Sequence, residues 1–218
     1  DPLFYVASIL AVFFCVFRFF YAGKFFVAGF GSTDLRFFFL AIPYISILMI
    51  PLLVFRMRSL LFDDSLPILP FFRFLSLNFA AFSVFAFSIL LLISIPVCVS
   101  FFGTVDFGQA FSGFLGIFFY GFCAICLSSL FFEIFSSSPI LPVFLSSIVL
   151  ALVNFLHLLP LYFQTGSFLT FLCRKISFAW HFDSFSKGIL DSKDFSYYII
   201  FSLAFILLSV CFEYKRLG

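Results

Sequence analysis

Charged residues are scarce in this chain of 218 residues: 10% are Asp, Glu, Lys or Arg, whereas an ordinary soluble domain has about 25%. Hydrophobic residues make up 64% of the chain, and the mean hydropathy is +1.26. A soluble protein of this size has too much surface to hide so many apolar side chains from water. The composition therefore excludes a disordered protein and an ordinary cytosolic enzyme, and it places most of the chain in lipid.

The sequence also lacks the motifs of common catalytic and metal sites. It contains no G-x-x-x-x-G-K-S/T phosphate-binding loop, no H-E-x-x-H zinc motif and no G-x-S-x-G nucleophile motif. We interpret the two histidines, His157 and His181, and the C-x-x-C pair, Cys123 and Cys126, as packed or interfacial side chains. We therefore predict no catalytic site, no metal site and no cofactor held by this chain. The net charge of +2 is too small to indicate a nucleic-acid partner.

Long apolar runs predict six membrane-spanning helices, because a span needs about 20 apolar residues. Their approximate bounds are 3–20, 37–55, 74–98, 111–132, 142–159 and 195–212. The runs are continuous and do not alternate between apolar and polar residues, which favours helices over barrel strands. We therefore predict an all-α integral membrane protein with a single domain, residues 1–218. Gly113 and Gly116 on the fourth span indicate a face for close helix approach.

The connection between the second and third predicted spans mixes charged and apolar residues. Its charged residues are Arg56, Arg58, Asp63, Asp64 and Arg73. This composition predicts an interfacial segment that lies along the membrane surface instead of crossing it. Two interpretations fit: a solvated interfacial turn, or a docking surface for a cytoplasmic partner.

The connection before the last span, Ser167 to Asp194, is too polar to cross a membrane and too apolar for a free loop. Its aromatic residues around Trp180 suit the boundary between membrane and water. We expect one or two short interfacial or re-entrant helices on the outer side, with Asp194 as the N-cap of the last span.

The basic residues predict the orientation of the chain in the membrane only in part. Arg56, Arg58 and Arg73, together with Lys215 and Arg216 near the C-terminus, place these segments in the cytoplasm by the positive-inside rule. The basic residues of the outer connection oppose this orientation; they are Arg174, Lys175, Lys187 and Lys193.

One stretch carries a specific pattern. Residues 180–198 are similar to an H-F-x-x-F-x-R/K-G-x-x-D-x-R/K-D-x-x-Y-Y/F stretch that precedes the last span in one family of permeases. Its motif residues here are His181, Phe182, Phe185, Lys187, Gly188, Asp191 and Asp194. With Pro43-Tyr44 in the second span and Asn78 in the third, the chain resembles the membrane subunit of ABC-2 type ATP-binding-cassette exporters. The similarity is greatest to the six-span group that includes gliding-motility and multidrug-type permeases. Residues 56–65 depart from the family, since they are shorter than its acidic and basic run and lack its Gly-Thr.

The resemblance implies a mechanism and partners. Two permease subunits, either two copies of this chain or this chain and a related one, would form a dimer in the bacterial inner membrane. Two cytoplasmic ATPase subunits would hold ATP and Mg²⁺ and drive export. The ATPase-docking residues would be Arg56, Arg58, Asp63, Asp64 and Arg73, with Glu133 from the second cytoplasmic connection.

Two alternative functions belong to other classes of membrane protein. A structural or assembly subunit of a larger membrane complex, with no transport path, would have the same composition. An ion-coupled carrier is disfavoured, because Arg18 and Glu133 lie near span ends and the predicted spans show neither deep charges nor a convincing inverted repeat.

Overall fold

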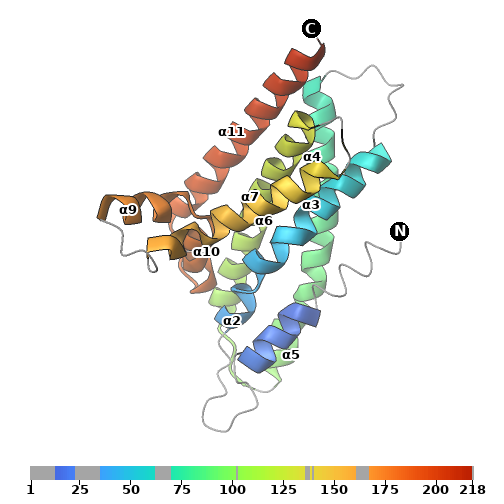
Figure 1. Ribbon diagram of the computed structural model, residues 1–218. Helices are drawn as coiled ribbons and strands as arrows, with labels where there is room; N and C mark the ends of the chain where they lie inside the picture. The colour runs from blue at the N-terminus through green and yellow to red at the C-terminus, as the bar shows by residue number, and fades with distance from the viewer. Residues whose placement is uncertain are drawn as a thin grey trace.

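The computed structural model describes residues 13–22, 35–61, 70–101, 103–135, 138, 140–160 and 167–217, and this part of the chain contains helices and no strand. The elements are, in order, η1 (Arg18–Ala22), α2 (Arg36–Phe39), α3 (Ile42–Leu61), α4 (Pro70–Leu92), α5 (Ser94–Ser100), α6 (Phe107–Ile134), α7 (Leu141–Phe155), η2 (Leu156–Leu158), α9 (Ser167–Ile176), α10 (Phe178–Ser186) and α11 (Ser192–Leu217). They form an elongated helical bundle (Figure 1).

Five helical stretches are long and apolar enough to cross a membrane. They are Arg36–Leu60, Phe71–Ser100, Phe107–Ile134, Leu141–Leu158 and Ser192–Lys215. These stretches correspond to the second to sixth predicted spans, so the chain has the features of a multi-pass membrane protein. The first predicted span, 3–20, lies mostly outside the described residues, although residues 13–22 are helical. Five candidate spans are therefore observed among the described residues, and the sixth stays a prediction.

Helix α6 is the centre of the bundle. Helices α3, α4, α7, α10 and α11 all pack against it. Most of its span is buried inside the molecule, whereas the spans of α4, α7 and α11 bury less than a third of their length. Because those outer helices keep long apolar faces, lipid is the solvent that matches them.

Two features explain where helices begin and end. Helix α6 begins at Phe107 because the side chain of Asp106 accepts hydrogen bonds from the backbone N–H groups of Gly108 and Gln109. Helix α4 ends at Leu92 and α5 begins at Ser94, with a turn between them. Pro96 has no N–H to donate to the carbonyl of Leu92, and its ring crowds that carbonyl, which accounts for the break.

Glycines on α6 let aromatic side chains from other helices come close to its backbone. A Cβ atom at Gly113 would overlap the ring of Phe39, and one at Gly121 would overlap the ring of Phe85. Other helices therefore do come close to α6 at its glycines, as the sequence predicts. Phenylalanine rings fill the spaces, here called niches, where a larger residue would have its side chain.

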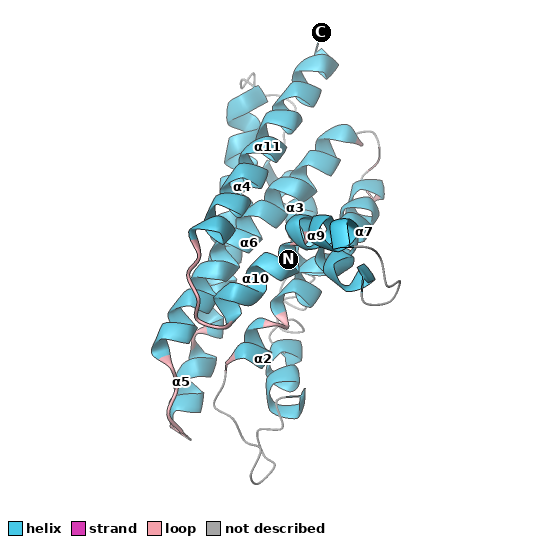
Figure 2. Cartoon of the chain, turned by 90° about the vertical axis from the view of Figure 1, so that its left-hand side faces the viewer, coloured by secondary structure: helices cyan, strands magenta, loops and turns pink. Residues whose placement is uncertain are grey.

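The two ends of the bundle differ. The last turns of α3, α6 and α11 and the first turn of α4 lie at one end, which we call the charged end (Figure 1). Helices α2 and α10 and the first turn of α11 lie toward the other end, which we call the short-helix end. Helix α9 projects sideways and faces the viewer in Figure 2. The predicted outer segment therefore does contain two short helices, α9 and α10, and their interfacial placement stays a prediction.

Candidate functional site

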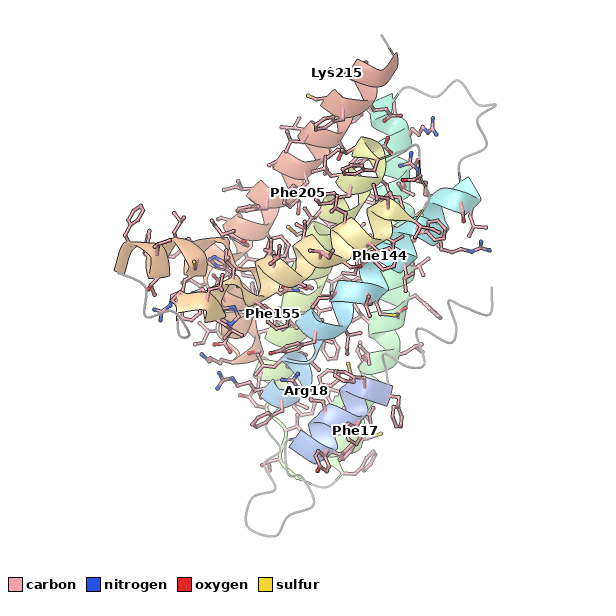
Figure 3. The ribbon with its side chains drawn as sticks, viewed as in Figure 1. Phe17, Arg18, Phe144, Phe155, Phe205 and Lys215 are labelled. Atoms are coloured by element: carbon pink, nitrogen blue, oxygen red, sulfur yellow. The ribbon has the colours of Figure 1, made fainter. Side chains whose placement is uncertain are left out.

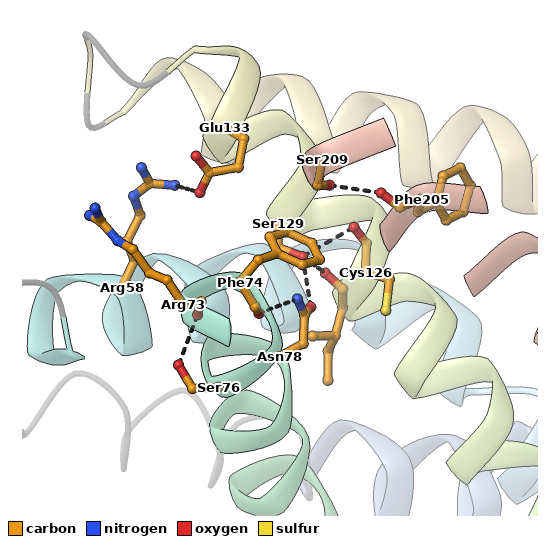
Figure 4. A network of polar contacts seen from close by, with 11 residues as sticks. Arg58, Arg73, Phe74, Ser76, Asn78, Cys126, Ser129, Glu133, Phe205 and Ser209 are labelled. Atoms are coloured by element: carbon orange, nitrogen blue, oxygen red, sulfur yellow. Dashed lines mark hydrogen bonds and ion pairs between the residues drawn. The ribbon is translucent and has the colours of Figure 1, made fainter. Parts of the chain in front are cut away.

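An ion pair joins two helices at the charged end. The guanidinium of Arg58, in the last turns of α3, donates to Oε1 of Glu133, near the end of α6, over 2.6 Å (Figure 4). The side chain of Glu133 is 6% exposed and that of Arg58 is 18% exposed. A buried carboxylate in this setting needs its cation, because an uncompensated buried charge is strongly destabilising. The pair thus fixes α3 to α6.

The other predicted docking residues fall around this pair. Arg56 is half-buried and donates to the hydroxyl of Ser59 over 3.4 Å. Arg73 is half-buried in the first turns of α4, at the same end of the bundle (Figure 4). Asp63 and Asp64 lie outside the described residues. Four of the six predicted docking residues therefore lie at the charged end of the bundle. Two of these four, Arg58 and Glu133, are bonded to each other.

A buried amide connects α4 to α6 just inside the charged end. Asn78 donates from Nδ2 to the carbonyl of Phe74 over 2.8 Å and accepts at Oδ1 from the hydroxyl of Ser129 over 2.7 Å. Ser129 lies one helical turn from Glu133, so the two polar contacts follow one another along α6 (Figure 4). Interhelical hydrogen bonds of this kind hold membrane helices together where the hydrophobic effect does not.

A second buried polar cluster lies further along α6 and joins three candidate spans. The hydroxyl of Tyr120 contacts the hydroxyl of Ser46 on α3 and accepts from Nδ2 of Asn154 on α7 over 3.0 Å. Asn154 also donates to the carbonyl of Pro43 over 3.1 Å. All three side chains are buried. Sequence reasoning did not identify this cluster; the available signal was the presence of Ser46, Tyr120 and Asn154 inside apolar runs.

His157, in η2, packs at the edge of this cluster. Its Nδ1 lies 2.9 Å from the hydroxyl of Ser177 and 2.9 Å from the carbonyl of Asn154. Ser177 in turn accepts from the backbone N–H of Trp180 at the start of α10. The histidine therefore ties the end of α7 to α10, which is the packed role expected for it.

In the stretch that resembles the permease pattern, the buried side chains of His181 and Asp194 contact each other. Nδ1 of His181 lies 2.6 Å from Oδ1 of Asp194, and Nε2 lies 3.2 Å from the carbonyl of Lys175. The imidazole stacks on the ring of Tyr197, with 3.9 Å between ring centroids. The pair joins α10 to α11.

The predicted cap of the last helix is replaced by a neighbouring residue. Helix α11 begins at Ser192, and the backbone N–H of Lys193 donates to Oδ1 of Asp191 over 3.0 Å. Asp194 instead lies inside the first turn and faces His181. The expectation that Asp194 caps the helix was therefore wrong, because a buried imidazole competes for its carboxylate and Asp191 is free to cap.

The remaining motif residues pack α10 against α6. Phe182 and Phe185 are fully buried, and a Cβ atom at Gly116 of α6 would collide with Phe185. Gly188 ends the segment with a φ of +86°, a left-handed conformation that glycine adopts without strain. The backbone carbonyl of Phe185 accepts from Ser112 over 2.9 Å. These residues pack α10 and the turn that follows it against α6.

Asp183 forms ion pairs with two basic residues at the short-helix end. It is bonded to Arg36 over 3.0 Å and to Lys187 over 2.5 Å. Burial alone raises the pKa of the Asp183 carboxyl, but hydrogen bonds from Lys187 and Arg36 and their positive charges lower it overall below its ordinary value. The carboxylate therefore stays ionised at neutral pH and keeps α2 attached to α10.

Metal ligands do not gather in the described residues: no three His, Cys, Asp or Glu side chains come together there. Cys123 and Cys126 are buried inside α6 as free thiols. Comparison of the chain with protein-family models, with curated proteins and with solved structures finds no match.

Proposed function

We propose that this chain is the permease subunit of an ABC-2 type transporter, which moves a substrate across the membrane with ATP hydrolysed by a separate cytoplasmic subunit. The supporting features are the resemblance of residues 180–198, the five candidate spans and the make-up of the charged end. The observation that carries the proposal is the 2.6 Å pair between Arg58 and Glu133. It joins the ends of α3 and α6, which lead into the two predicted cytoplasmic connections, so a single partner at this end could contact both.

The pair also gives the partner a mechanical connection to the bundle. The proposed docking segment follows α3 directly, and Arg58 ties the last turns of α3 to α6. Helices α4, α7, α10 and α11 all pack on α6. A displacement of the docking segment on ATP binding is therefore passed to the central helix and, through it, to the helices of the opposite end.

The proposal includes further partners and a location. The chain pairs with a second permease subunit in the bacterial inner membrane, and ATP and Mg²⁺ are held by the ATPase. The charged end faces the cytoplasm. Basic residues also occur at the short-helix end, namely Arg18, Arg36, Arg174, Lys175, Lys187 and Lys193, so the orientation rests on the docking segment and not on a count of charges.

Charge reversal at the charged end tests the docking assignment. In a pull-down of the tagged chain in mild detergent, Arg56→Glu with Arg73→Glu should lower the recovered ATP-binding subunit by about tenfold or more, because like charges across an interface cost several kcal/mol. Asp63→Arg with Asp64→Arg should do the same.

The matched control is Lys175→Glu with Lys193→Glu, two exposed lysines near the short-helix end, which should leave recovery unchanged. Full recovery of the ATPase with both charged-end variants would refute the docking assignment. Recovery of a large complex that contains no ATP-binding subunit would favour the structural-subunit alternative.

A further inference from the structure

A cavity of about 210 Å³ lies where α3, the end of α7 and α10 meet. Its lining includes the aromatic residues Tyr44 and Trp180 and the polar residues Asn154, His157 and Asp183. Aromatic walls with a few convergent polar groups are the usual make-up of a binding site for a small group.

The cavity lies at the end of two candidate spans. Tyr44 lies in the first turn of α3, in the first half of the span Arg36–Leu60, and Asn154 and His157 lie near the end of the span Leu141–Leu158. Tryptophan and tyrosine are enriched at this depth, where lipid headgroups meet water. A ligand in the cavity is therefore at headgroup level.

Two guanidinium groups stack on aromatic rings of residues that line the cavity. Cζ of Arg18 lies 4.5 Å from the centre of the Tyr44 ring, and Cζ of Arg174 lies 4.7 Å from the centre of the Trp180 ring. A guanidinium that stacks on an aromatic face keeps its N–H donors in its own plane, where they can bond an anion bidentately. Figure 3 shows Arg18 and Phe155 at the same end of the bundle.

The local charge balance favours an anion. The one carboxylate in the lining, Asp183, is already compensated by Arg36 and Lys187. Arg18 and Arg174 add two positive charges beside this group, whose net charge is already positive. A cationic ligand would meet a carboxylate with two bound cations and ring faces already covered by guanidinium groups.

An apolar strip leads from the cavity along α7. Phe155 lines the cavity, and Leu152, Ile148 and Phe144 follow at intervals of three or four residues, each with 36% to 67% of its surface exposed. These intervals place the four side chains on one face of the helix. Figure 3 shows Phe144 and Phe155 on the same helix. The strip matches an acyl chain that begins at the cavity.

We propose that this cavity binds the phosphate of an anionic lipid headgroup, with Arg18 and Arg174 as its partners and the acyl chains along the exposed strip of α7. A free phosphate ion shares the headgroup chemistry but gains nothing from the strip, which is why the lipid is the assigned source.

Trp180 is the only tryptophan in the chain, so its fluorescence reports on this cavity. The full chain is reconstituted in phosphatidylcholine, and dibrominated phosphatidylglycerol or dibrominated phosphatidylcholine is titrated as a quencher. Half-maximal quenching should need about 25-fold less phosphatidylglycerol, because each of the two arginines near an anionic headgroup is worth roughly fivefold in affinity.

Matched variants separate the cavity from general surface charge. Arg18→Gln with Arg174→Gln should make the two lipids quench equally, whereas Lys193→Gln with Lys215→Gln, which removes the same charge at exposed positions, should keep the preference. Ala179→Leu, which fills the cavity without changing charge, should also abolish the preference.

Three outcomes would overturn the proposal. They are equal quenching of the native chain by both lipids, an unchanged preference in both the double arginine variant and Ala179→Leu, and displacement of the brominated lipid by inorganic phosphate at matched ionic strength. The last outcome would assign the cavity to a soluble phosphate.

Discussion

Replacing Glu133 by leucine should destabilise the protein by about 3 kcal/mol, because breaking a buried ion pair by removing one partner is strongly destabilising. Arg58 lies 2.6 Å from Glu133 and is 18% exposed, so its guanidinium would lose its bonded carboxylate while staying largely shielded from water. The double variant Arg58→Leu with Glu133→Leu should recover most of the lost stability, since an apolar pair of similar volume replaces the ion pair. Thermal unfolding in detergent measures all three variants and gives the coupling energy as a double-mutant cycle.

The control for this cycle is Arg36→Leu, which breaks the more exposed pair with Asp183. Its side chain is 40% exposed, and Asp183 keeps Lys187 as a partner. The loss should be below about 1 kcal/mol, as for other partly exposed pairs. A double leucine variant no more stable than Glu133→Leu alone would contradict the assigned pair.

Placing a branched side chain at Gly121 should lower the yield of folded protein. The Cβ atom of valine would overlap the ring of Phe85, which fills the niche on α6. Overpacking of a filled core costs about 1–3 kcal/mol, and occasionally more. The yield of monodisperse Gly121→Val protein in size-exclusion chromatography should therefore fall sharply.

A compensating variant and a control make this prediction specific. Phe85→Ala combined with Gly121→Val should restore much of the yield, because the smaller side chain vacates the niche. Ser83→Val, at an exposed position on α4, introduces the same side chain where nothing crowds it and should be tolerated. Normal yield of Gly121→Val alone would show that the ring of Phe85 does not occupy the niche.

Hydropathy located the candidate spans because lipid thickness fixes their length, whatever the packing partners are. The fourth predicted span, 111–132, became α6, Phe107–Ile134. The extra first turn follows from Asp106, whose capping role could be inferred from its residue type. The sequence does not show which side chain fills the space beside each glycine. Gly121 and Phe85 are far apart in the chain and meet only because α4 packs on α6.

The charged residues were recognised as informative, but their pairing was not. Arg58 and Glu133 are separated by 75 positions, and each alone was consistent with an exposed docking charge. Asp194 was expected to cap a helix, because a cap is a local interaction, whereas its bond to His181 depends on how α10 packs. Asn154 was overlooked, although an amide inside an apolar run needs a partner when it is buried.

The central claim is that this chain is the membrane half of an ATP-driven transporter. The measurement that tests it most directly is the native mass of the complex purified through the tagged chain in mild detergent, followed by identification of its subunits. We expect two permease subunits and two copies of an ATP-binding subunit. A stable assembly that lacks any ATP-binding subunit, or a chain that purifies only by itself, would contradict it.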